Sequence, residues 1–572
     1  MRAGPWTPWF ALPPDYRRAG WRADLLAGLT LGIILVPQAM AYGLLAGVPP
    51  VYGLYAALLP LVVYALLGSS PHVSVGPTAL ASLLCLNGLD GVAAAGSPEY
   101  LGYAILLAGL TGALQLLFGL LRLGGLVSLL SRPVLSGFVS AAAVLIIASQ
   151  LDALVGISAP RSSRLHETLW SLCHHLGSLD ARSAALGVSC LVALLACARW
   201  APRWPAMLTV LVVATGAVAA GGPFFGGVAT VGEVPAGLPG LVLPAVTGEQ
   251  LTALLPVAFV LALISFIETL SIGKTFASRH GYYRMWPNRE LVALGLSKLV
   301  GVAWGAIPTS ASFSRSAVVE EAGGRGPLSG LVAAGLLVLV LLFLTPLFYH
   351  LPIPALAAVI IFSVRRLFDW GEMRRLRELA PKELFTLLIT LGFTLFAGLE
   401  YGITGGVLLS LGFVLLRAAR PHLAELGRVP GTNAFRNLAR FPDAVVDPEL
   451  LIVRFDAELY FGNGEHFRER VLALAAERDE RLRAVILDAH TIGDLDSSGL
   501  YELDELYRAL GRRGVDLYLT GLIGPVRDML FRGGLMERLG ADRQFLSVQD
   551  AVTHFRQRGS GRDWGRPAVQ HG

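Results

Sequence analysis

Charged residues are scarce in this sequence of 572 residues. Asp, Glu, Lys and Arg make up only 15% of it, hydrophobic residues make up 54%, and the mean hydropathy is +0.60. Because soluble domains carry about a quarter charged residues, this composition excludes a wholly soluble protein. Apolar runs of about 20 residues, the length that crosses a bilayer core, recur from Leu25 to Leu416 and stop after Arg420. We therefore expect a polytopic membrane domain followed by a soluble C-terminal domain.

Cysteine is also rare, and recognisable catalytic motifs are missing. The four cysteines, Cys85, Cys173, Cys190 and Cys197, lack metal-ligand spacing, so we expect no metal site and no cofactor. No nucleophile–base set or P-loop is recognisable, so we expect no enzyme. The net charge of +5 comes largely from Lys and Arg in short loops between apolar runs. The positive-inside rule explains that distribution, so we expect no nucleic-acid binding.

The apolar runs predict fourteen spans in an all-α membrane domain. Loops rich in Lys and Arg alternate with loops that have neither, at 47–51, 87–99, 222–248 and 350–352. The segment 156–182, with Arg161, Arg164 and Arg182, departs from this alternation. The rule places both termini in the cytoplasm and the protein in the cytoplasmic (inner) membrane. The expected spans are 24–46, 52–68, 75–88, 100–121, 134–155, 183–200, 205–221, 250–277, 288–304, 313–323, 327–350, 353–367, 383–398 and 401–419.

Two of these spans are too short to cross a membrane. Residues 75–87 and 313–323 each follow an extended, proline-containing stretch, and each is the third span of its half of the chain. Interrupted helices at matching positions point to a transport site between two inverted repeats of seven spans. The alternative is that both segments are loops misinterpreted as half-helices.

Facing half-helix N-termini would favour an anion, because each presents free N–H groups and a partial positive charge. Arg315, near the start of the second half-helix, adds a full charge. Its alternatives are a side chain that extends to the cytoplasm or an ion pair with Glu320 or Glu321. The expected substrate-binding residues at these N-termini are Thr78, Ala79, Phe313, Ser314 and Arg315.

Three further polar features lie within apolar spans. Glu268 and Lys298 fall deep in consecutive spans, which predicts either a site for ion or proton coupling or a structural ion pair. Gln38 and Tyr42 lie four residues apart in the first span, just after Pro37. They would share one helical face that lines the cavity or packs against another helix.

Several segments resemble the SulP family, the sulfate permeases and related anion exchangers. The run from Pro37-Gln38-Ala39-Met40-Ala41-Tyr42 to Val51-Tyr52-Gly53-Leu54-Tyr55 is similar to the family signature. So are Glu268 to Gly281, Leu294-Gly295, the run Ser312-Phe313-Ser314-Arg315-Ser316-Ala317-Val318, and Gly402-Ile403 with Gly405-Gly406. The resemblance covers the chain from about residue 20 to 557.

The resemblance implies a substrate-holding core of spans 1–4 and 8–11 and a gate of spans 5–7 and 12–14. It implies a homodimer that carries sulfate, bicarbonate, chloride, oxalate or a dicarboxylate. Ser314 and Arg315 match the anion-site motif, Gln38, Tyr42 and Phe313 would line the pocket, and Glu268 matches the acidic position of proton or cation coupling. The chain departs from sodium-coupled members at Ile272 and Phe313, which favours protons over sodium. It also departs at Lys298, where asparagine is usual.

The C-terminal region alternates between short apolar strands and helical patterns, which predicts an α/β domain. Expected strands are 450–455, 484–488 and 515–520, and expected helices are 464–477, 498–512 and 525–533. Leu495-Asp496-Ser497-Ser498-Gly499-Leu500 resembles the STAS domain, in which the serine equivalent to Ser498 is phosphorylated in some relatives. Alternatively, Ser497 and Ser498 cap the helix. The expected domains are a transport domain at 1–420, a linker at 421–447, a STAS domain at 448–558 and a disordered tail at 559–572.

The leading hypothesis is a secondary active transporter, surrounded by membrane lipid, that carries a small inorganic anion or dicarboxylate across the membrane. It would work by proton-coupled symport or by anion exchange. The second is an anion-responsive membrane sensor that signals to a cytoplasmic partner through its STAS domain. A nucleobase–cation symporter of the same fold is the third, and Arg315 and the STAS segment disfavour it. The sequence leaves the choice of anion open.

Overall fold

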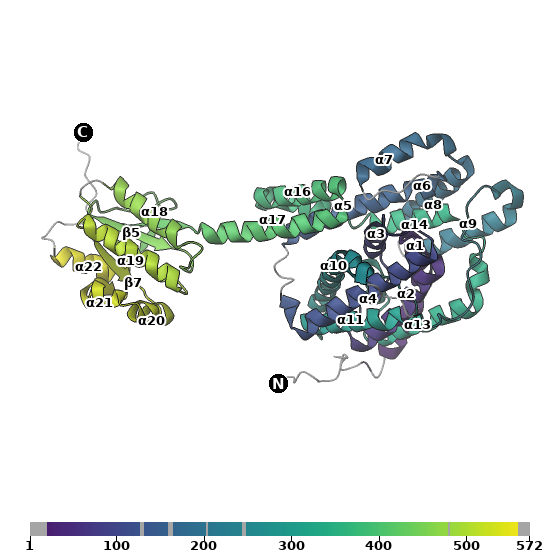
Figure 1. Ribbon diagram of the computed structural model, residues 1–572, viewed down its shortest axis with the longest axis horizontal. Coiled ribbons are helices and arrows are strands. Elements are labelled where there is room, and N and C mark those ends of the chain that lie inside the picture. Colours follow the sequence, from purple (N-terminus) through teal and green to yellow (C-terminus); the bar gives the residue numbers. More distant parts are fainter. Residues whose placement is uncertain are drawn as a thin grey trace. The chain divides into compact units, whose positions relative to one another are not determined.

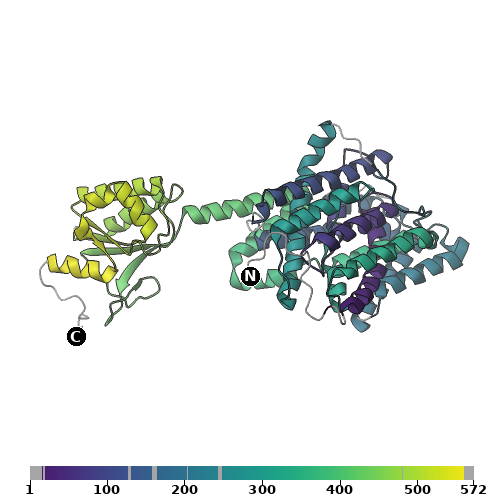
Figure 2. The ribbon, with the colours of Figure 1, turned by 90° about the horizontal axis from the view of Figure 1, so that it is seen from below.

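The chain folds into two units, residues 1–410 and 411–572, in a computed structural model (Figure 1). The structure describes residues 16, 20–125, 131–157, 164–201, 204–242, 248–478 and 481–558. The tail that we expected to be disordered, 559–572, lies outside the described residues. The first unit consists almost entirely of helices, and the second contains a sheet (Figure 2).

The first part of the helical unit runs from α1 to α9. Its elements are α1 (Trp21–Leu45), α2 (Pro50–Leu67), β1 (Ser74–Gly76), α3 (Ala79–Gly88), α4 (Pro98–Leu120), α5 (Arg132–Ser149), α6 (Leu151–Val155), α7 (Leu165–His174), α8 (Ala181–Trp200) and α9 (Ala206–Gly221).

The second part repeats the order helix, helix, short strand, short helix. Its elements are α10 (Gly248–His280), α11 (Pro287–Val302), β2 (Ser310–Ser312), α12 (Phe313–Glu321), α13 (Leu328–Leu339) with a π-turn (Val340–Leu344) and a 3-10 turn (Thr345–Phe348), α14 (Ile353–Val364), α15 (Trp370–Leu379), α16 (Pro381–Ala397) and α17 (Leu399–Ala419).

Among the described residues, eight helices are long and apolar enough to cross a membrane. Large apolar side chains remain exposed on several of them, including Val213, Phe259 and Phe343. Such surfaces suit contact with lipid tails, so the helical unit is a multi-pass membrane domain. The eight are Trp21–Leu45, Pro50–Leu67, Pro98–Leu120, Arg132–Val155, Ala181–Trp200, Ala206–Phe225, Gln250–His280 and Leu328–Phe348.

Helices from the first part of this unit pack against helices from the second. The principal pairs are α4 with α11, α1 with α13, α5 with α16, α2 with α11, α4 with α10, and α8 with α14. Gly112 and Gly295 show how closely α4 and α11 approach. A Cβ atom on Gly112 would lie 3.0 Å from the carbonyl oxygen of Gly295, and one on Gly295 would lie 2.6 Å from the amide nitrogen of Leu116. Only glycine fits at Gly295 without a shift of the backbone.

Both short helices are present: α12 begins at Phe313, as the sequence predicted, whereas α3 begins at Ala79, four residues after the predicted start. Helix α3 has 10 residues and α12 has 9, and a three-residue strand precedes each. These findings confirm the prediction of two half-helices with extended leads, and the alternative that both segments are loops is wrong. Proline explains the late start of α3, because Pro77 disfavours helical backbone at the residue before it.

The second unit is built on a six-stranded sheet in the order β4-β3-β5-β6-β7-β8. Strands β5 to β8 run parallel, and β3 pairs antiparallel with both β4 and β5. The elements are β3 (Leu423–Arg428), β4 (Phe435–Asn437), β5 (Leu450–Phe455), α18 (Gly464–Glu477), β6 (Ala484–Asp488), α19 (Ser497–Arg512), β7 (Asp516–Thr520), α20 (Gly524–Arg532), α21 (Leu535–Leu539), β8 (Gln544–Phe545) and α22 (Val548–Arg558).

Alternation along the strands divides the apolar side chains between two cores. In β5, Leu451, Val453 and Phe455 join the core under α18 to α21, whereas Leu450 and Ile452 join the core under α22. The predicted strands and helices of this α/β domain are confirmed to within a residue. The segment 421–447, expected to be a linker, contains β3 and β4 and therefore belongs to the sheet.

Candidate functional site

The leads to the two half-helices pair with each other. Strand β1 runs antiparallel to β2, with Ser74 opposite Ser312 and Gly76 opposite Ser310. Helix α3 follows β1 and α12 follows β2. Because the two strands are antiparallel, the helices leave the ribbon in different directions, and both N-termini lie beside it. Thr78 caps α3 by accepting a hydrogen bond from the Ala81 amide at 3.3 Å, and Ser312 caps α12. The remaining N–H groups of each first turn have no partner within their helix.

Arg315 joins the two half-helices. Its guanidinium is fully buried, and Nη1 donates to the Pro77 carbonyl at 2.9 Å while Nε donates to Ser74 Oγ at 3.4 Å. Nη2 has no hydrogen-bond partner among the described residues. The side chain therefore does not extend to the cytoplasm. Glu320, one of its alternative partners, binds Arg279 and His280 instead, at 2.9 and 3.0 Å.

A buried guanidinium with an unused N–H pair is costly unless a ligand completes its hydrogen bonds. The positive ends of α3 and α12 add to the same field. Gly76 leaves room there, because a Cβ atom at this position would lie 3.3 Å from Nη2. The site therefore suits a small anion with several acceptor oxygens.

Of the two predicted lining residues on α1, only Tyr42 has a described interaction with Arg315. Gln38 and Tyr42 are both buried on α1, and Tyr42 lies close enough to Arg315 for an electrostatic interaction. Gln38 Nε2 contacts Met207 Sδ of α9 at 3.4 Å, and Gln38 Oε1 has no partner among the described residues. A weak sulfur partner and an unpaired oxygen leave this amide available to a ligand.

The start of α12 is more open than the start of α3. Phe313 is 48% exposed and Ser314 is exposed, whereas Thr78 and Ala79 are buried. The Phe313 ring stacks on Phe276 of α10 with centroids 5.8 Å apart. The first turn of α12 therefore presents these two side chains outward, although Arg315 one residue later is buried.

Glu268 and Lys298 lie near this site but do not form an ion pair in the described structure. Ser310 of β2 donates to Glu268 Oε2 at 2.5 Å. Lys298 is fully buried, and its ammonium donates to Gln115 Oε1 at 2.9 Å. The two charges still interact electrostatically. The alternative of a direct structural pair is wrong, and both residues remain candidates for coupling.

Sequence reasoning missed Ser74, Gln115 and Ser310. Gln115 Nε2 donates to the Ala262 carbonyl at 2.9 Å and to Ser265 Oγ at 2.6 Å, which turns its oxygen toward Lys298. A single amide within the apolar run 100–121 was the available signal. The two serines carried no signal, because Ser74 reaches Arg315 only through the pairing of β1 with β2, and Ser310 reaches Glu268 only through the packing of β2 on α10.

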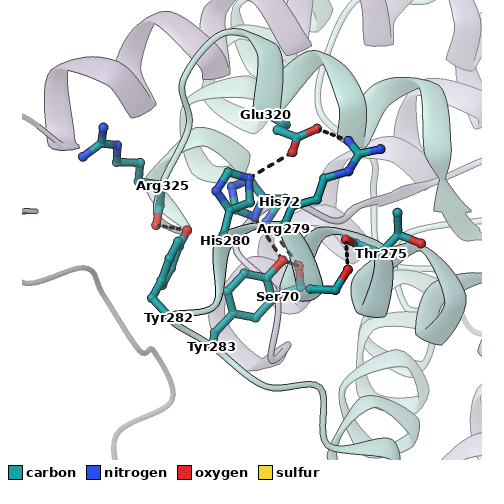
Figure 3. Close-up of polar contacts among 10 residues, drawn as sticks. Ser70, His72, Thr275, Arg279, His280, Tyr282, Tyr283, Glu320 and Arg325 are labelled. Carbon is teal, nitrogen blue, oxygen red and sulfur yellow. Dashed lines mark hydrogen bonds and ion pairs between the residues drawn. The ribbon is translucent and has the colours of Figure 1, made fainter.

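A polar cluster holds the end of α10 against both half-helix segments (Figure 3). His72, in the loop before β1, shares a hydrogen bond between its Nδ1 and Tyr283 Oη at 3.1 Å, and its ring stacks on His280 with centroids 4.6 Å apart. Glu320, at the end of α12, holds Arg279 and His280. Burial, together with the neighbouring His280, lowers the pKa of His72 from 6.5 to about 4. At neutral pH this cluster therefore contains a neutral His72.

In the second unit, Asp496 caps α19. Its carboxylate accepts a hydrogen bond from the Gly499 amide at 2.7 Å, and the helix begins at Ser497. The interpretation of Ser497 and Ser498 as caps is therefore wrong, because Asp496 already fills that position. Ser498 lies in the first turn and is partly exposed.

Comparisons with known proteins find relatives for both units of the chain. Residues 21–390 match the Sulfate permease family, and residues 441–551 match the STAS domain. A probable sulfate transporter of Mycobacterium tuberculosis, MT1781, is 36% identical over 98% of this chain and 99% of its own length. The chloroplastic sulfate transporter 4.1 of Arabidopsis thaliana is 36% identical over 93% of this chain and 80% of its own.

Solved structures share the fold. Murine Slc26a9, an anion transporter in the inward-facing state, superposes with a TM-score of 0.86 at 27% identity, covering 94% of this chain and 92% of its own. The transmembrane domain of the cyanobacterial bicarbonate transporter BicA gives a TM-score of 0.61 at 26% identity, covering 70% of this chain and 98% of its own. The chain is thus a transporter rather than an enzyme, and it belongs to the sulfate permease family with a C-terminal STAS domain.

Proposed function

We propose that this protein is a secondary active transporter of a small anion, with sulfate as the first candidate substrate. The observation that carries the proposal is Arg315, buried between two half-helix N-termini with Nη2 unused. Sulfate offers four oxygens to these donors, and guanidinium groups bind such oxyanions in a bidentate manner. The relatives named as sulfate transporters support this choice, and BicA keeps bicarbonate in the panel of anions to be tested.

We infer an alternating-access mechanism with a mobile core and a gate. The core comprises α1–α4 and α10–α13, which include Arg315, Glu268 and both half-helices. The gate comprises α5–α9, α14, α16 and α17. The contact between Gln38 of α1 and Met207 of α9 lies at the boundary between the two. Fourteen spans in two inverted halves, a homodimer and both termini in the cytoplasm complete the proposal.

We further propose that Glu268 couples transport to protons. Ser310 connects its carboxylate to β2, and Arg315 follows β2 by three residues, so a change of charge at Glu268 reaches the anion site over a short path. Lys298 balances the charge of Glu268 without binding it directly. Sodium is the weaker candidate, because Ile272 and Phe313 stand where sodium-coupled members of the family have small or hydroxyl residues, and their side chains offer no oxygen ligand.

Uptake into proteoliposomes tests the anion site. Labelled sulfate, bicarbonate, fumarate and chloride are supplied with and without an inward proton gradient to wild type, Arg315→Ala, Arg315→Lys and the exposed-loop control Arg284→Ala. We expect uptake of one anion to collapse in Arg315→Ala and to be partly retained in Arg315→Lys, which keeps the charge but loses the planar fork. Arg284→Ala should resemble wild type. Full uptake in Arg315→Ala would contradict the proposed site.

The coupling proposal has its own test. Glu268→Gln keeps an oxygen that can accept the hydrogen bond from Ser310, but its amide cannot gain or lose a proton. We expect it to abolish stimulation by the proton gradient while exchange of labelled for unlabelled anion persists. Full uptake with unchanged pH dependence would remove Glu268 from the coupling mechanism.

The sensor hypothesis is the second candidate, and the STAS domain is the feature that favours it. It predicts anion binding without net uptake, together with a change at Ser498 or its surroundings. Folded wild-type protein that binds an anion but transports none of the panel would support the sensor over the transporter.

A further inference from the structure

Helix α15 is short and amphipathic and lies directly before a span. It follows the pair Arg365–Arg366, carries three arginines of its own and ends two residues before α16 begins. Leu376 is its buried apolar residue, and the helix packs against α16. Asp369 caps its N-terminus by accepting from the Glu372 amide at 2.9 Å. The helix is therefore a built element that is held at the end of a membrane span.

One face of α15 combines an exposed tryptophan with two free arginines. Trp370, Arg374 and Arg377 are spaced four and three residues apart, so their side chains share one side of the helix. Trp370 is 69% exposed, and both arginines are exposed. In the described part of the chain neither arginine has an ion-pair partner.

The acidic residues in and beside α15 only partly offset this charge. Glu372 pairs with Arg375 at 3.3 Å, and Asp369 caps the helix. Glu378, exposed and four residues after Arg374, lies on the same side of the helix but forms no ion pair with either arginine in the described part of the chain. Arg366, four residues before Trp370, is also exposed and without a described ion-pair partner. Three arginines against the single carboxylate of Glu378 leave this face with a net positive charge beside an indole ring.

The neighbouring surface of α16 is apolar and faces outward. Phe385 is 61% exposed and Phe396 is 60% exposed, at the two ends of the span. In a membrane protein such a surface contacts lipid tails, so α15 lies beside that lipid at the level of its headgroups. Tryptophan prefers this interface, and basic residues are attracted to the anionic lipids there.

We propose that the Trp370–Arg374–Arg377 face of α15 binds the headgroups of anionic phospholipids on the arginine-rich side of the membrane. The two guanidinium groups pair with lipid phosphates, and the indole of Trp370 lies among the headgroups. Charge complementarity and continuity with the lipid-facing surface of α16 select this occupant over a soluble partner. The binding anchors the connection between α14 and α16.

Native mass spectrometry of the full-length protein tests the proposal. Detergent-solubilised protein is incubated with equal amounts of phosphatidylglycerol and phosphatidylcholine, and the retained lipids are counted. Each basic residue near an anionic surface strengthens binding by about fivefold, so the double variant Arg374→Gln/Arg377→Gln should lose preference for phosphatidylglycerol by roughly tenfold or more. Arg374→Lys/Arg377→Lys, which keeps both charges, should retain the preference.

The matched control is Arg436→Gln/Arg440→Gln, which removes two exposed charges from the second unit. It should leave lipid retention unchanged. Wild-type preference in Arg374→Gln/Arg377→Gln would overturn the proposal, and so would an equal loss in the control, because general charge would then explain the binding. Displacement of the lipid by millimolar inorganic phosphate would also overturn it in favour of a site for a soluble anion.

Discussion

Gln115 is the residue whose role is most sharply defined by its contacts. Its amide donates to two acceptors on α10, and its oxygen accepts from the ammonium of Lys298 at 2.9 Å. Removal of a partner from a buried charged group costs more than the hydrogen bond itself is worth, because the charge stays desolvated. The amide therefore keeps a cation stable in the interior of the membrane domain.

We predict that Gln115→Leu destabilises the protein by about 1–3 kcal/mol. The double variant Gln115→Leu/Lys298→Met should regain part of this loss, because both polar partners are then replaced by apolar groups. Thermal unfolding of the purified protein, analysed as a double-mutant cycle, measures the coupling. Additive losses in the double variant would show that Lys298 does not depend on Gln115.

His72 predicts a specific dependence of stability on pH. Its folded-state pKa of about 4 lies below its ordinary value of 6.5, so the unfolded chain binds more protons between these values. This residue therefore contributes its full stability above pH 6.5 and loses it as the pH falls toward 4, by roughly 3 kcal/mol at most.

The pH dependence of the unfolding temperature checks this prediction. Between pH 6.5 and 4, His72→Gln should show a shallower fall than wild type. The exposed His175 is the matched control, and His175→Gln should follow the wild-type curve. Parallel curves for wild type and His72→Gln would mean that His72 is not held neutral by its surroundings.

At the scale of elements, the ribbon of β1 and β2 makes the two half-helices one body. Val75 lies opposite Ala311 in this ribbon, and both side chains are buried. Two further sets of contacts connect these segments: the hydrogen bond from Arg315 to Pro77, and the cluster around His72. We therefore expect the half-helices to move together within the core during transport.

A reversible crosslink tests this expectation. Val75→Cys/Ala311→Cys, placed in a background without the four native cysteines, should form a disulfide on oxidation, because paired residues of antiparallel strands lie within reach of this bond. Uptake should be unchanged by oxidation and by subsequent reduction, with each single cysteine variant as control. Uptake that stops on oxidation and returns on reduction would show that the half-helices move apart.

The elements that the sequence predicted well are those with a strong local pattern. The half-helices were recognisable because Pro77 and Pro308 interrupt apolar runs, and β5, β6 and α18 because their periodicity is clear. Strands β3 and β4 were missed because 421–447 is polar and contains turn residues, so only pairing with β5 makes it part of the sheet. Helix α15 was missed because its arginines resemble an ordinary loop.

At the scale of the whole molecule, the family and the soluble domain followed from the sequence, whereas the bonding of the site did not. Arg315 and Glu268 were identified as isolated charges in apolar surroundings. Their partners, Ser74 and Ser310, are small hydroxyl residues of a type found throughout the chain. The pairing of Glu268 with Ser310 rather than Lys298 depends on the packing of β2 against α10, which local sequence does not encode.

We propose that the transported anion binds at Arg315 between the two half-helices. Selenate, an analogue of sulfate, gives an anomalous X-ray signal that locates it directly in crystals of the protein. We expect a peak beside the β1–β2 ribbon, with selenate oxygens about 3 Å from the Arg315 guanidinium. A peak elsewhere in the membrane domain, or none here while selenate competes with sulfate for uptake, would contradict it.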